Sequence, residues 1–461
     1  MTVRVRFSAA SCGLSLAGAR VALYSWLYAR HEGGTLVLCV EDVAPSRPVA
    51  PGAGSLCDDM RWLGLDWDEG PCLRSERTKG YKECAQQLLD RGAATASAFA
   101  PGPGDPSPSH ERIRLGAPPR EQYTIVDLVQ GTQVVQARSA EAPTLFATEG
   151  PPSPSLAAVA DDHELGITHV IQAHERWPEL FTYLHLCEVL GWRPPRFAHL
   201  PALSFDDTSA RPSSLQSCRE QGYLGLAVAN DLCRMGWTPR GRRELLPPTE
   251  LAARFDLSRV ARGPYTPAPR QLEWLNRRCL AQLDPTQRTG LMVDRWQRAY
   301  GLADRSQGTG LTPAAWRQML ADAVSGQVHA LAEVPDQVRF AFVDQVDPDP
   351  QAAQALSRLY AGQVLEAFVE GLSTVEPFAY EEIDAMISEL RWHFKAVLGV
   401  RSRDVLHVVR AALTGRVDAP CLVVACQLLG RTRCLQRAQH KLQRAQQGRQ
   451  RAQQKLQRIG E

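Results

Sequence analysis

The chain has 461 residues, of which 44% are hydrophobic and 22% are charged, and its formal net charge at pH 7 is +2. No uninterrupted apolar stretch approaches the roughly 18–20 residues that cross a bilayer as a helix, which excludes a membrane-spanning helix. The length and composition predict a globular protein of several domains. Because the net charge is close to zero, any surface that binds nucleic acid must be local.

The N-terminus runs directly into a strand pattern without a signal peptide, which predicts a cytoplasmic protein. The twelve cysteines are scattered from Cys12 to Cys434, without close pairs at metal-binding spacing. We therefore expect reduced thiols and no disulfide framework.

The first elements alternate between strand and helix. Apolar residues at every second position predict a strand over residues 3–7, and a helical pattern follows over 22–28. Gly13 and Gly18 lie between them among small residues. Such a strand, turn and helix can seat a phosphate on the N–H groups of the helix N-terminus. Residues 1–90 thus predict the first half of a doubly wound sheet.

An insertion interrupts this sheet. Residues 100–119 are rich in Pro, Gly and Ser, which predicts a loop. Strand patterns at 113–115 and 123–129 predict a small inserted domain over residues 91–150. The second half of the sheet is expected over 151–205.

After this point the pattern is helical to the end of the chain. We expect one helical region over 206–310 and a second over 311–434. Proline-containing breaks interrupt the helical pattern at residues 247–248, 263–264 and 348–350.

Residues 435–461 repeat with a period of seven. The copies are Leu435-Gln-Arg-Ala-Gln, Leu442-Gln-Arg-Ala-Gln, Arg449-Gln-Arg-Ala-Gln and Leu456-Gln-Arg. A basic helix of this kind can pair with another helix or follow RNA phosphates. Its apolar stripe is thin, so we favour a solvated helical tail and keep helix pairing as the alternative.

Residues 6–20, here called the first signature, read R-F-S-A-A-S-C-G-L-S-L-A-G-A-R, and residues 40–47 read V-E-D-V-A-P-S-R. They resemble the motifs R-F-A-P-S-P-T-G-x-L-H-L-G-G-A-R and I-E-D-T-D-x-x-R of the glutamyl-tRNA synthetases, a class I family. The resemblance continues in order through residues 60–71, 74–81, 161–170, 190–201, 222–224, 235–238, 272–276, 410–415 and 428–431. It implies a Rossmann-type α/β catalytic domain with a shortened insert, followed by all-α stem-contact and anticodon-binding domains.

The resemblance also implies a reaction. ATP with Mg²⁺ activates the carboxylate of an amino acid, and the acyl group then passes to the terminal ribose of a tRNA. The implied partners are ATP, glutamate or another amino acid, and a tRNA such as tRNA(Glu). We expect a monomer, apart from any pairing of the tail.

The positions implied to bind ATP depart from the family pattern. Ser15 stands in place of the first-signature histidine, and Gly13 lies one residue closer to it than the family pattern has. The second signature, normally Lys-Leu-Ser-Lys-Arg, falls in residues 205–214, where Arg211 is the only cation. Ser15, Gly18 and Arg211 are therefore the degraded catalytic positions, and Gly13 joins them as an ATP-binding position. Losing one preorganised donor typically costs about 10²–10³ in rate.

The amino-acid pocket implied by the resemblance is also altered. Arg6 and Glu41 are kept, but Gln172 replaces an arginine and Pro154 replaces a tyrosine. A glutamine cannot give the bidentate, charge-assisted contact that an arginine gives a carboxylate. We expect a lowered affinity for free glutamate.

No metal site built from the chain's own side chains is expected. Residues 98–100 replace a Cys-x-Cys zinc knuckle found in many family members, so no zinc is expected. Residues 161–163 and His174–Glu175 contain potential metal ligands but favour a structural role, and His199 is predicted to be a packing histidine.

These changes favour a degenerate paralogue, with weak or absent ATP-dependent glutamylation of tRNA, that retains tRNA or nucleotide binding. Two alternatives stay open. One is an active glutamate–tRNA ligase in which Ser15, Arg211 and backbone groups do the usual work. The other is an ATP-dependent ligase for another amino acid or an acyl carrier.

Overall fold

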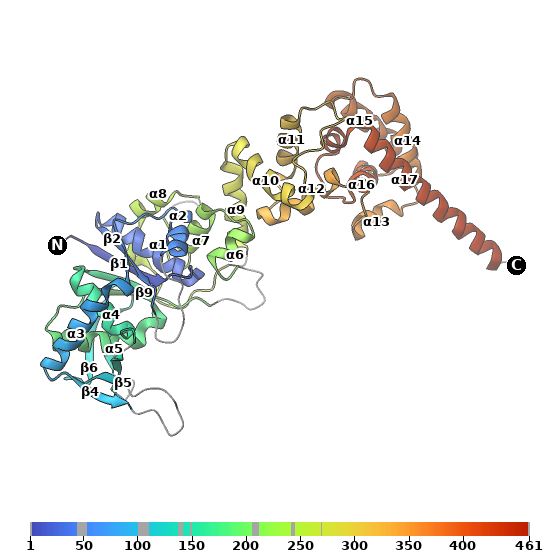
Figure 1. Ribbon diagram of the computed structural model, residues 1–461. Coiled ribbons are helices and arrows are strands. Elements are labelled where there is room, and N and C mark those ends of the chain that lie inside the picture. The colour runs from blue at the N-terminus through green and yellow to red at the C-terminus, as the bar shows by residue number, and fades with distance from the viewer. Residues whose placement is uncertain are drawn as a thin grey trace. The chain divides into compact units, whose positions relative to one another are not determined.

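The structure is a computed structural model. It describes residues 2–43, 53–99, 110–136, 142–147, 150–204, 212–240, 245–268 and 270–459. The chain forms two compact units, Met1–Cys279 and Leu280–Glu461 (Figure 1). In the parts that the structure describes, no helix is both long enough and apolar enough to cross a membrane.

The first unit is built on a five-stranded sheet with parallel strands in the order β10-β9-β1-β2-β3. The strands are β1 (Arg4–Ala10), β2 (Thr35–Glu41), β3 (Glu69–Leu73), β9 (His169–Ala173) and β10 (Arg196–Leu200). The central strand β1 pairs with β2 on one side and with β9 on the other. The strand order therefore reverses between β1 and β9, which is where ligands bind in doubly wound sheets. The predicted Rossmann-type α/β class is confirmed.

Helices connect these strands and cover the sheet. They are α1 (Leu16–His31), α2 (Gly54–Trp62), α3 (Thr78–Asp90), α4 (Pro154–Glu164) and α5 (Leu180–Leu190), with 3₁₀ turns η1 (Arg74–Arg77) and η2 (His174–Glu179). Every residue of β2 from Leu36 to Val40 is buried. Such a continuous apolar run is what a parallel strand needs when both faces of its sheet are covered.

The insertion between the two halves of the sheet is antiparallel. One sheet has the order β4-β5-β8, with β4 (Ala94–Phe99), β5 (His110–Leu115) and β8 (Thr144–Ala147), and β6 (Gln122–Asp127) forms a hairpin with β7 (Gly131–Gln136). The strands predicted at 113–115 and 123–129 coincide with the end of β5 and with β6. Of the positions matching the zinc knuckle, Ala98 and Phe99 end β4, and Ala100 lies outside the described residues.

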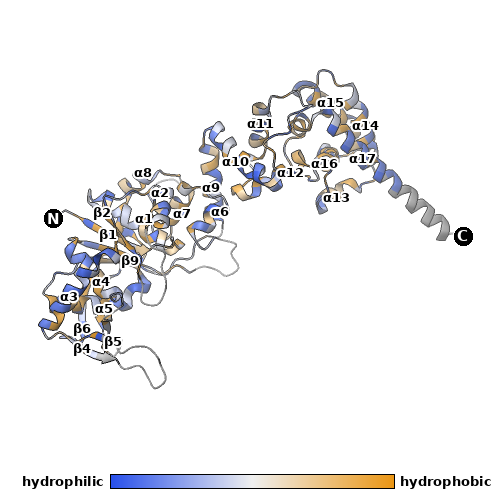
Figure 2. Cartoon of the chain, viewed as in Figure 1, coloured by the Kyte–Doolittle hydropathy of each residue, from blue (hydrophilic) through white to orange (hydrophobic). Residues whose placement is uncertain are grey.

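The rest of the first unit is helical, with α6 (Leu215–Glu220), α7 (Gly225–Cys233), α8 (Pro248–Arg254) and α9 (Gln271–Gln282), which runs into the second unit. The second unit contains α10 (Pro285–Tyr300), α11 (Pro313–Ser325), α12 (Val334–Phe342), α13 (Pro350–Leu356), α14 (Ala361–Thr374), α15 (Tyr380–Leu398), α16 (Ser402–Thr414) and α17 (Leu422–Ile459). Figure 2 shows hydrophobic and hydrophilic residues alternating along these helices, the pattern of helices that pack on one face. The predicted breaks at Pro248 and Pro350 are helix starts, where proline needs no N–H partner.

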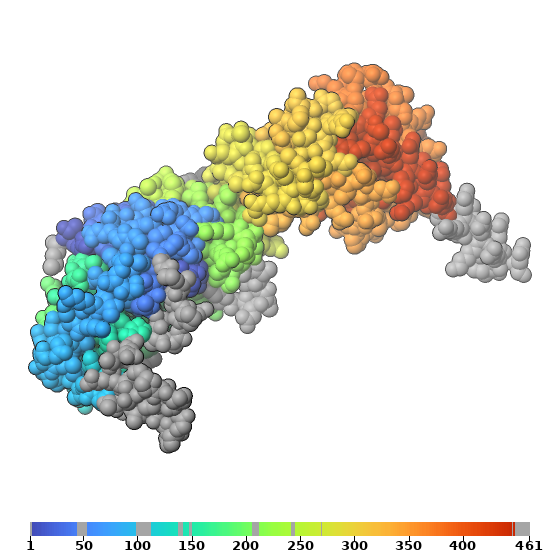
Figure 3. Space-filling model, viewed as in Figure 1, coloured from blue at the N-terminus to red at the C-terminus, as the bar shows by residue number. Residues whose placement is uncertain are grey.

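The prediction of a solvated tail is wrong for the first copy of the seven-residue repeat. Helix α17 already includes this copy, and its Arg437 and Lys441 side chains are buried. Figure 3 shows the red surface of α17 lying directly against the orange helices that precede it. This first copy is buried because its Arg437 and Lys441 side chains donate to main-chain carbonyls of the second unit, including those of Phe340 and Val346. Arg444, one period later, is exposed.

Candidate functional site

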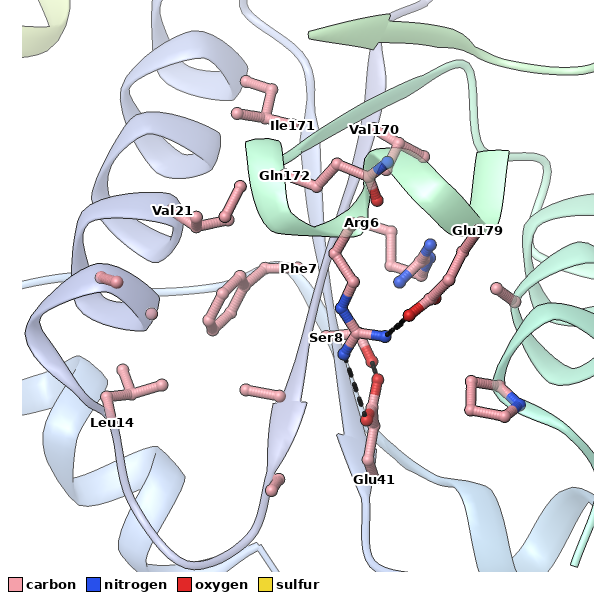
Figure 4. A pocket seen from close by; sticks show the side chains of 18 of the residues that line it. Arg6, Phe7, Ser8, Leu14, Val21, Glu41, Val170, Ile171, Gln172 and Glu179 are labelled. Atoms are coloured by element: carbon pink, nitrogen blue, oxygen red, sulfur yellow. Dashed lines mark hydrogen bonds and ion pairs between the residues drawn. The ribbon is translucent and has the colours of Figure 1, made fainter. Parts of the chain in front are cut away.

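A cavity of about 340 Å³ opens at the carboxyl ends of β1, β2 and β9 (Figure 4). Its walls come from the end of β1, from Glu41 on β2, from Gln172 on β9, and from the N-terminus of α1 with the turns η1 and η2. This is the point where the strand order reverses. The topology therefore places the cavity where a doubly wound sheet binds its ligand.

The first-signature turn connects β1 to α1 along one wall. Gly13 has a φ of +96°, and a Cβ at this position would lie 3.2 Å from a carboxylate oxygen of Asp59, so the turn requires glycine. Ser15 is the N-cap of α1, and its Oγ accepts a hydrogen bond from the Gly18 amide at 3.1 Å. The Leu16 amide donates to the carbonyl of Ser213, in the second-signature segment, at 3.4 Å. Two first-turn amides that could face a phosphate thus already have acceptors.

Asp59 on α2 fastens this turn to the segment that follows the second signature. Its buried carboxylate accepts from the Leu14 amide at 2.8 Å and pairs with Arg219 of α6 at 3.0 Å. The Leu215 amide donates to the Leu14 carbonyl at 3.2 Å. Burial raises the pKa of Asp59, against the opposing effect of the Leu14 amide and Arg219. The end of the second signature therefore returns to the first, while Arg211 itself lies outside the described residues.

Arg6 lies on the face of β1 opposite to the buried Val5 and Phe7. Its guanidinium makes a two-pronged contact with Asp162 of α4, from Nε at 2.5 Å and from Nη2 at 3.2 Å. The Tyr183 hydroxyl donates to the same carboxylate at 2.8 Å. Burial opposes the charge of Arg6, but the ion pair outweighs it and raises the pKa of Arg6. Arg6 is thus a fixed cation in the cavity wall.

Glu41 is surrounded by donors from three elements. Its carboxylate accepts from the Ser8 hydroxyl at 3.0 Å, and it pairs with Arg74 at 3.3 Å and with Arg176 at 3.9 Å. Arg176 also binds Glu179 at 3.0 Å, so that one guanidinium joins the two glutamates in Figure 4. Burial alone disfavours the Glu41 carboxylate, but these partners outweigh it and lower the pKa of Glu41.

Gln172 lies at the end of a buried hydrogen-bonded row. Its side-chain amide donates to Nε2 of His199 at 2.7 Å, and Nδ1 of His199 faces the Asp127 carboxylate at 2.6 Å. An amide nitrogen only donates, so Nε2 of His199 accepts and Nδ1 carries the proton. His199 is fully buried, which confirms it as a packing histidine. It also orients the side chain of Gln172.

The acidic pair on α4 has structural partners. Asp161 binds Arg77 at 2.6 Å, and the ring of His163 stacks on Trp192 with centroids 3.8 Å apart. Within the described ranges, no three His, Cys, Asp or Glu side chains are grouped as metal ligands. These contacts support the structural role predicted for residues 161–163.

A second cavity, of about 440 Å³, lies in the helical second unit. Three arginines line it, Arg391 of α15 and Arg403 and Arg410 of α16, together with His407. Asp418 is the one carboxylate among the described lining residues, and it pairs at 3.0 Å with Arg416, which is not part of the lining. Burial lowers the pKa of His407, and the neighbouring arginines lower it further. The excess of arginines suits an anion such as an RNA phosphate.

The structure brings together most of the predicted site. Seven predicted positions line the first cavity, namely Arg6, Gly13, Ser15, Gly18, Glu41, Pro154 and Gln172. Sequence reasoning missed Arg74, Arg176 and Asp59. One signal was available for Arg176, because it follows the predicted site residue Gln172 by four residues. Arg74 and Asp59 carried no such signal, because only the fold brings them to the cavity and its turn.

Two family models match the chain. The model of tRNA synthetases class I (E and Q), catalytic domain, matches residues 2–100 and 104–274, and the anticodon binding domain matches residues 293–442. Among curated proteins, the glutamate–tRNA ligase of Geobacillus thermodenitrificans is 28% identical, over 95% of this chain and 98% of its own length. Glutamate–tRNA ligase 2 of Rhodospirillum rubrum is 30% identical, over 95% and 98%.

Solved structures show the same fold. The glutamate–tRNA synthetase of Elizabethkingia anophelis has a TM-score of 0.78 at 22% identity, covering 96% of this chain and 100% of its own. A glutamate–tRNA ligase of Elizabethkingia meningosepticum, in complex with its amino acid, has a TM-score of 0.77 at 21% identity, covering 96% and 99%.

Proposed function

The chain belongs to the family of class I tRNA synthetases (E and Q), and we propose that it is a degenerate glutamate–tRNA ligase-like protein. In this proposal, ATP-dependent glutamylation of tRNA is weak or absent and tRNA binding is retained. Relatives that align over nearly the whole chain are glutamate–tRNA ligases. The proposal therefore concerns how much of that activity this chain keeps.

The observation that carries the proposal is the state of the first-signature turn. Ser15, in place of the family's histidine, caps α1 by accepting from the Gly18 amide. The residue thus uses a backbone donor where an imidazole would offer one to a phosphate. The charge that develops on the α-phosphate therefore lacks the imidazole as a donor, and it also lacks the Gly18 amide, which donates to Ser15. Each lost donor typically costs about 10²–10³ in rate.

ATP with Mg²⁺ is the nucleotide that the family implies. The described residues of the first signature fit its phosphates poorly, because the amides of Leu16 and Gly18 already have acceptors. Mg²⁺ usually binds through substrate phosphates and one or two carboxylates, so a dedicated metal cage is not part of the proposal. Zinc is not part of it either, since the cysteines of the knuckle are replaced.

An active glutamate–tRNA ligase is the second candidate function. It is favoured by the preserved scaffold, in which Arg6 and Glu41 still line the cavity at the switch point of the sheet. The third candidate, a ligase with another acyl substrate, is favoured by Gln172, whose amide is held by His199. The rate of glutamylation separates the first two candidates.

The test is aminoacylation of tRNA(Glu) with radiolabelled glutamate and ATP, beside a working glutamate–tRNA ligase. We expect the chain to be at least about 10²-fold slower, because its first signature lacks the imidazole. The Ser15→His variant should raise the rate, whereas Ser155→His, which adds an imidazole elsewhere in the same cavity, should not. A wild-type rate within about tenfold of the working ligase would contradict the proposal.

A further inference from the structure

Each glutamate that lines the first-unit cavity is already paired with arginine. Among the described residues, the charged lining consists of three arginines and two glutamates. Glu41 pairs with Arg74 and Arg176, and Glu179 pairs with Arg176. Asp162, which holds Arg6, lies behind that arginine with 2% of its side chain exposed. The cavity therefore offers a ligand no carboxylate that lacks a cationic partner.

The arginines of the cavity, in contrast, have N–H donors that these carboxylates do not use. Arg74 is 7% exposed and lines the cavity, yet its Nε atom has no hydrogen-bond partner among the described residues. The Nη2 atom of the same guanidinium pairs with Glu41 at 3.3 Å. In the guanidinium of Arg6, Nε and Nη2 donate to Asp162, whereas an arginine has five N–H donors in all. Arg6 and Arg74 can therefore still donate hydrogen bonds to an accepting group of a ligand, such as a carboxylate oxygen.

A ligand ammonium group meets the opposite situation. To bind Glu41, it must share that carboxylate with two guanidinium groups and the Ser8 hydroxyl. Three cations around one carboxylate repel one another in a partly desolvated site. For an amino acid, this repulsion at the ammonium group therefore offsets much of the favourable binding free energy of its carboxylates.

We propose that the cavity selects a small dicarboxylate without an ammonium group, with one carboxylate at Arg6 and the other at Arg74 and Arg176. The cavity, of about 340 Å³, has room for a molecule of this size. This inference rests on the part of the proposed function that makes the cavity the acyl-substrate site. It does not depend on the rate of glutamylation or on tRNA binding.

The test is isothermal titration calorimetry of the full chain with glutarate, L-glutamate and inorganic phosphate. Glutarate and glutamate have the same carbon skeleton and differ in the ammonium group. We expect glutarate to bind at least about tenfold more tightly than glutamate, a difference of about 1.4 kcal/mol. Phosphate carries negative charge but has no second carboxylate, so it should bind more weakly than glutarate.

Variants locate the binding site and the source of the preference. Arg176→Ala should weaken glutarate at least about tenfold and narrow its advantage over glutamate, because it frees one side of Glu41. Arg176→Lys keeps the positive charge and should keep the order of affinities. The matched control is Arg120→Ala, which breaks an ion pair with Glu188 outside the cavity. The side chain of Arg176 is 44% exposed, so these variants should fold, which circular dichroism checks.

Several outcomes overturn the inference. They are equal or tighter binding of glutamate, equal binding of phosphate, no glutarate binding up to about 10 mM, or the same loss in Arg120→Ala as in Arg176→Ala. Filter binding of tRNA and glutamylation, measured on the same preparation, report on the proposed function separately. A protein that binds tRNA but prefers glutamate would contradict this inference alone.

Discussion

At the scale of single residues, Asp59 holds the shortened first-signature turn in place. Its carboxylate accepts from the Leu14 amide at 2.8 Å and pairs with Arg219 at 3.0 Å. The residue is 4% exposed and its bond to Leu14 is buried, so the Leu14 amide cannot readily turn to water if the carboxylate is removed. One side chain on α2 therefore links the turn before α1 to helix α6.

Replacing Asp59 distinguishes its hydrogen bonds from its charge. Asp59→Ala should lower the free energy of unfolding by about 1–3 kcal/mol, since it leaves the buried Leu14 amide without an acceptor. Asp59→Asn keeps an acceptor oxygen and removes a charge whose ionisation burial disfavours, so its loss should be smaller. Urea denaturation at pH 7 measures both values. Equal losses in the two variants would show that the ion pair with Arg219 matters more than the Leu14 hydrogen bond.

At the scale of elements, α17 stabilises the second unit through buried cations. Arg437 donates to the carbonyls of Phe340 and Val343, at the end of α12, and to that of Leu413 near the end of α16. Burial, reinforced by Arg433, lowers the pKa of Arg437 to about 10. Cations are favoured at helix C-termini, where carbonyls lack partners within the helix.

The seven-residue repeat provides its own control for this role. Arg437→Met should lower the free energy of unfolding by about 3 kcal/mol or more, because several buried carbonyls lose a charged donor. Arg444→Met changes the equivalent residue one period later, which is exposed, and should stay within about 0.5 kcal/mol of wild type. Urea denaturation followed by circular dichroism gives both values. Similar losses would mean that the buried contacts of Arg437 do not distinguish the two copies.

At the scale of the whole molecule, a net charge of +2 conceals a local concentration of positive charge. Arg391, Arg403 and Arg410 share one cavity of the second unit. That unit carries the match to the anticodon binding domain. The boundary between the two units lies at residues 279 and 280. The finer boundaries at 90, 150, 205, 310 and 434 stay predictions.

Binding of tRNA should show this local charge directly. We expect the full chain to bind tRNA(Glu) in a filter assay, with an affinity that falls as the salt concentration rises. Arg403→Ala should weaken binding and reduce the salt slope by about 1, as expected for one lost phosphate contact. Arg298→Ala, which removes a largely exposed arginine from α10, is the control and should leave the slope unchanged. Binding that does not respond to salt would contradict a phosphate contact at this cavity.

Much of the architecture could be predicted because it depends on local patterns. The alternation of Val5 and Phe7 marked β1, and the prolines at 248 and 350 marked helix starts. The pattern of the repeat was also correctly helical, but its burial was not predictable. Whether Arg437 faces water depends on carbonyls about 24 to 97 residues away in the sequence, which no local pattern reports.

The amino-acid sequence by itself determined the strand and helix order, the family resemblance and the presence of Ser15 where that resemblance implies a histidine, because these are properties of residue type and spacing. Only the tertiary structure showed that Ser15 caps α1, that Asp59 holds the turn, and that Arg74 and Arg176 converge on Glu41. The physical reason is that pairing and burial of charges depend on distances between segments far apart in the chain. Those distances decide which charges of the cavity remain available to a ligand.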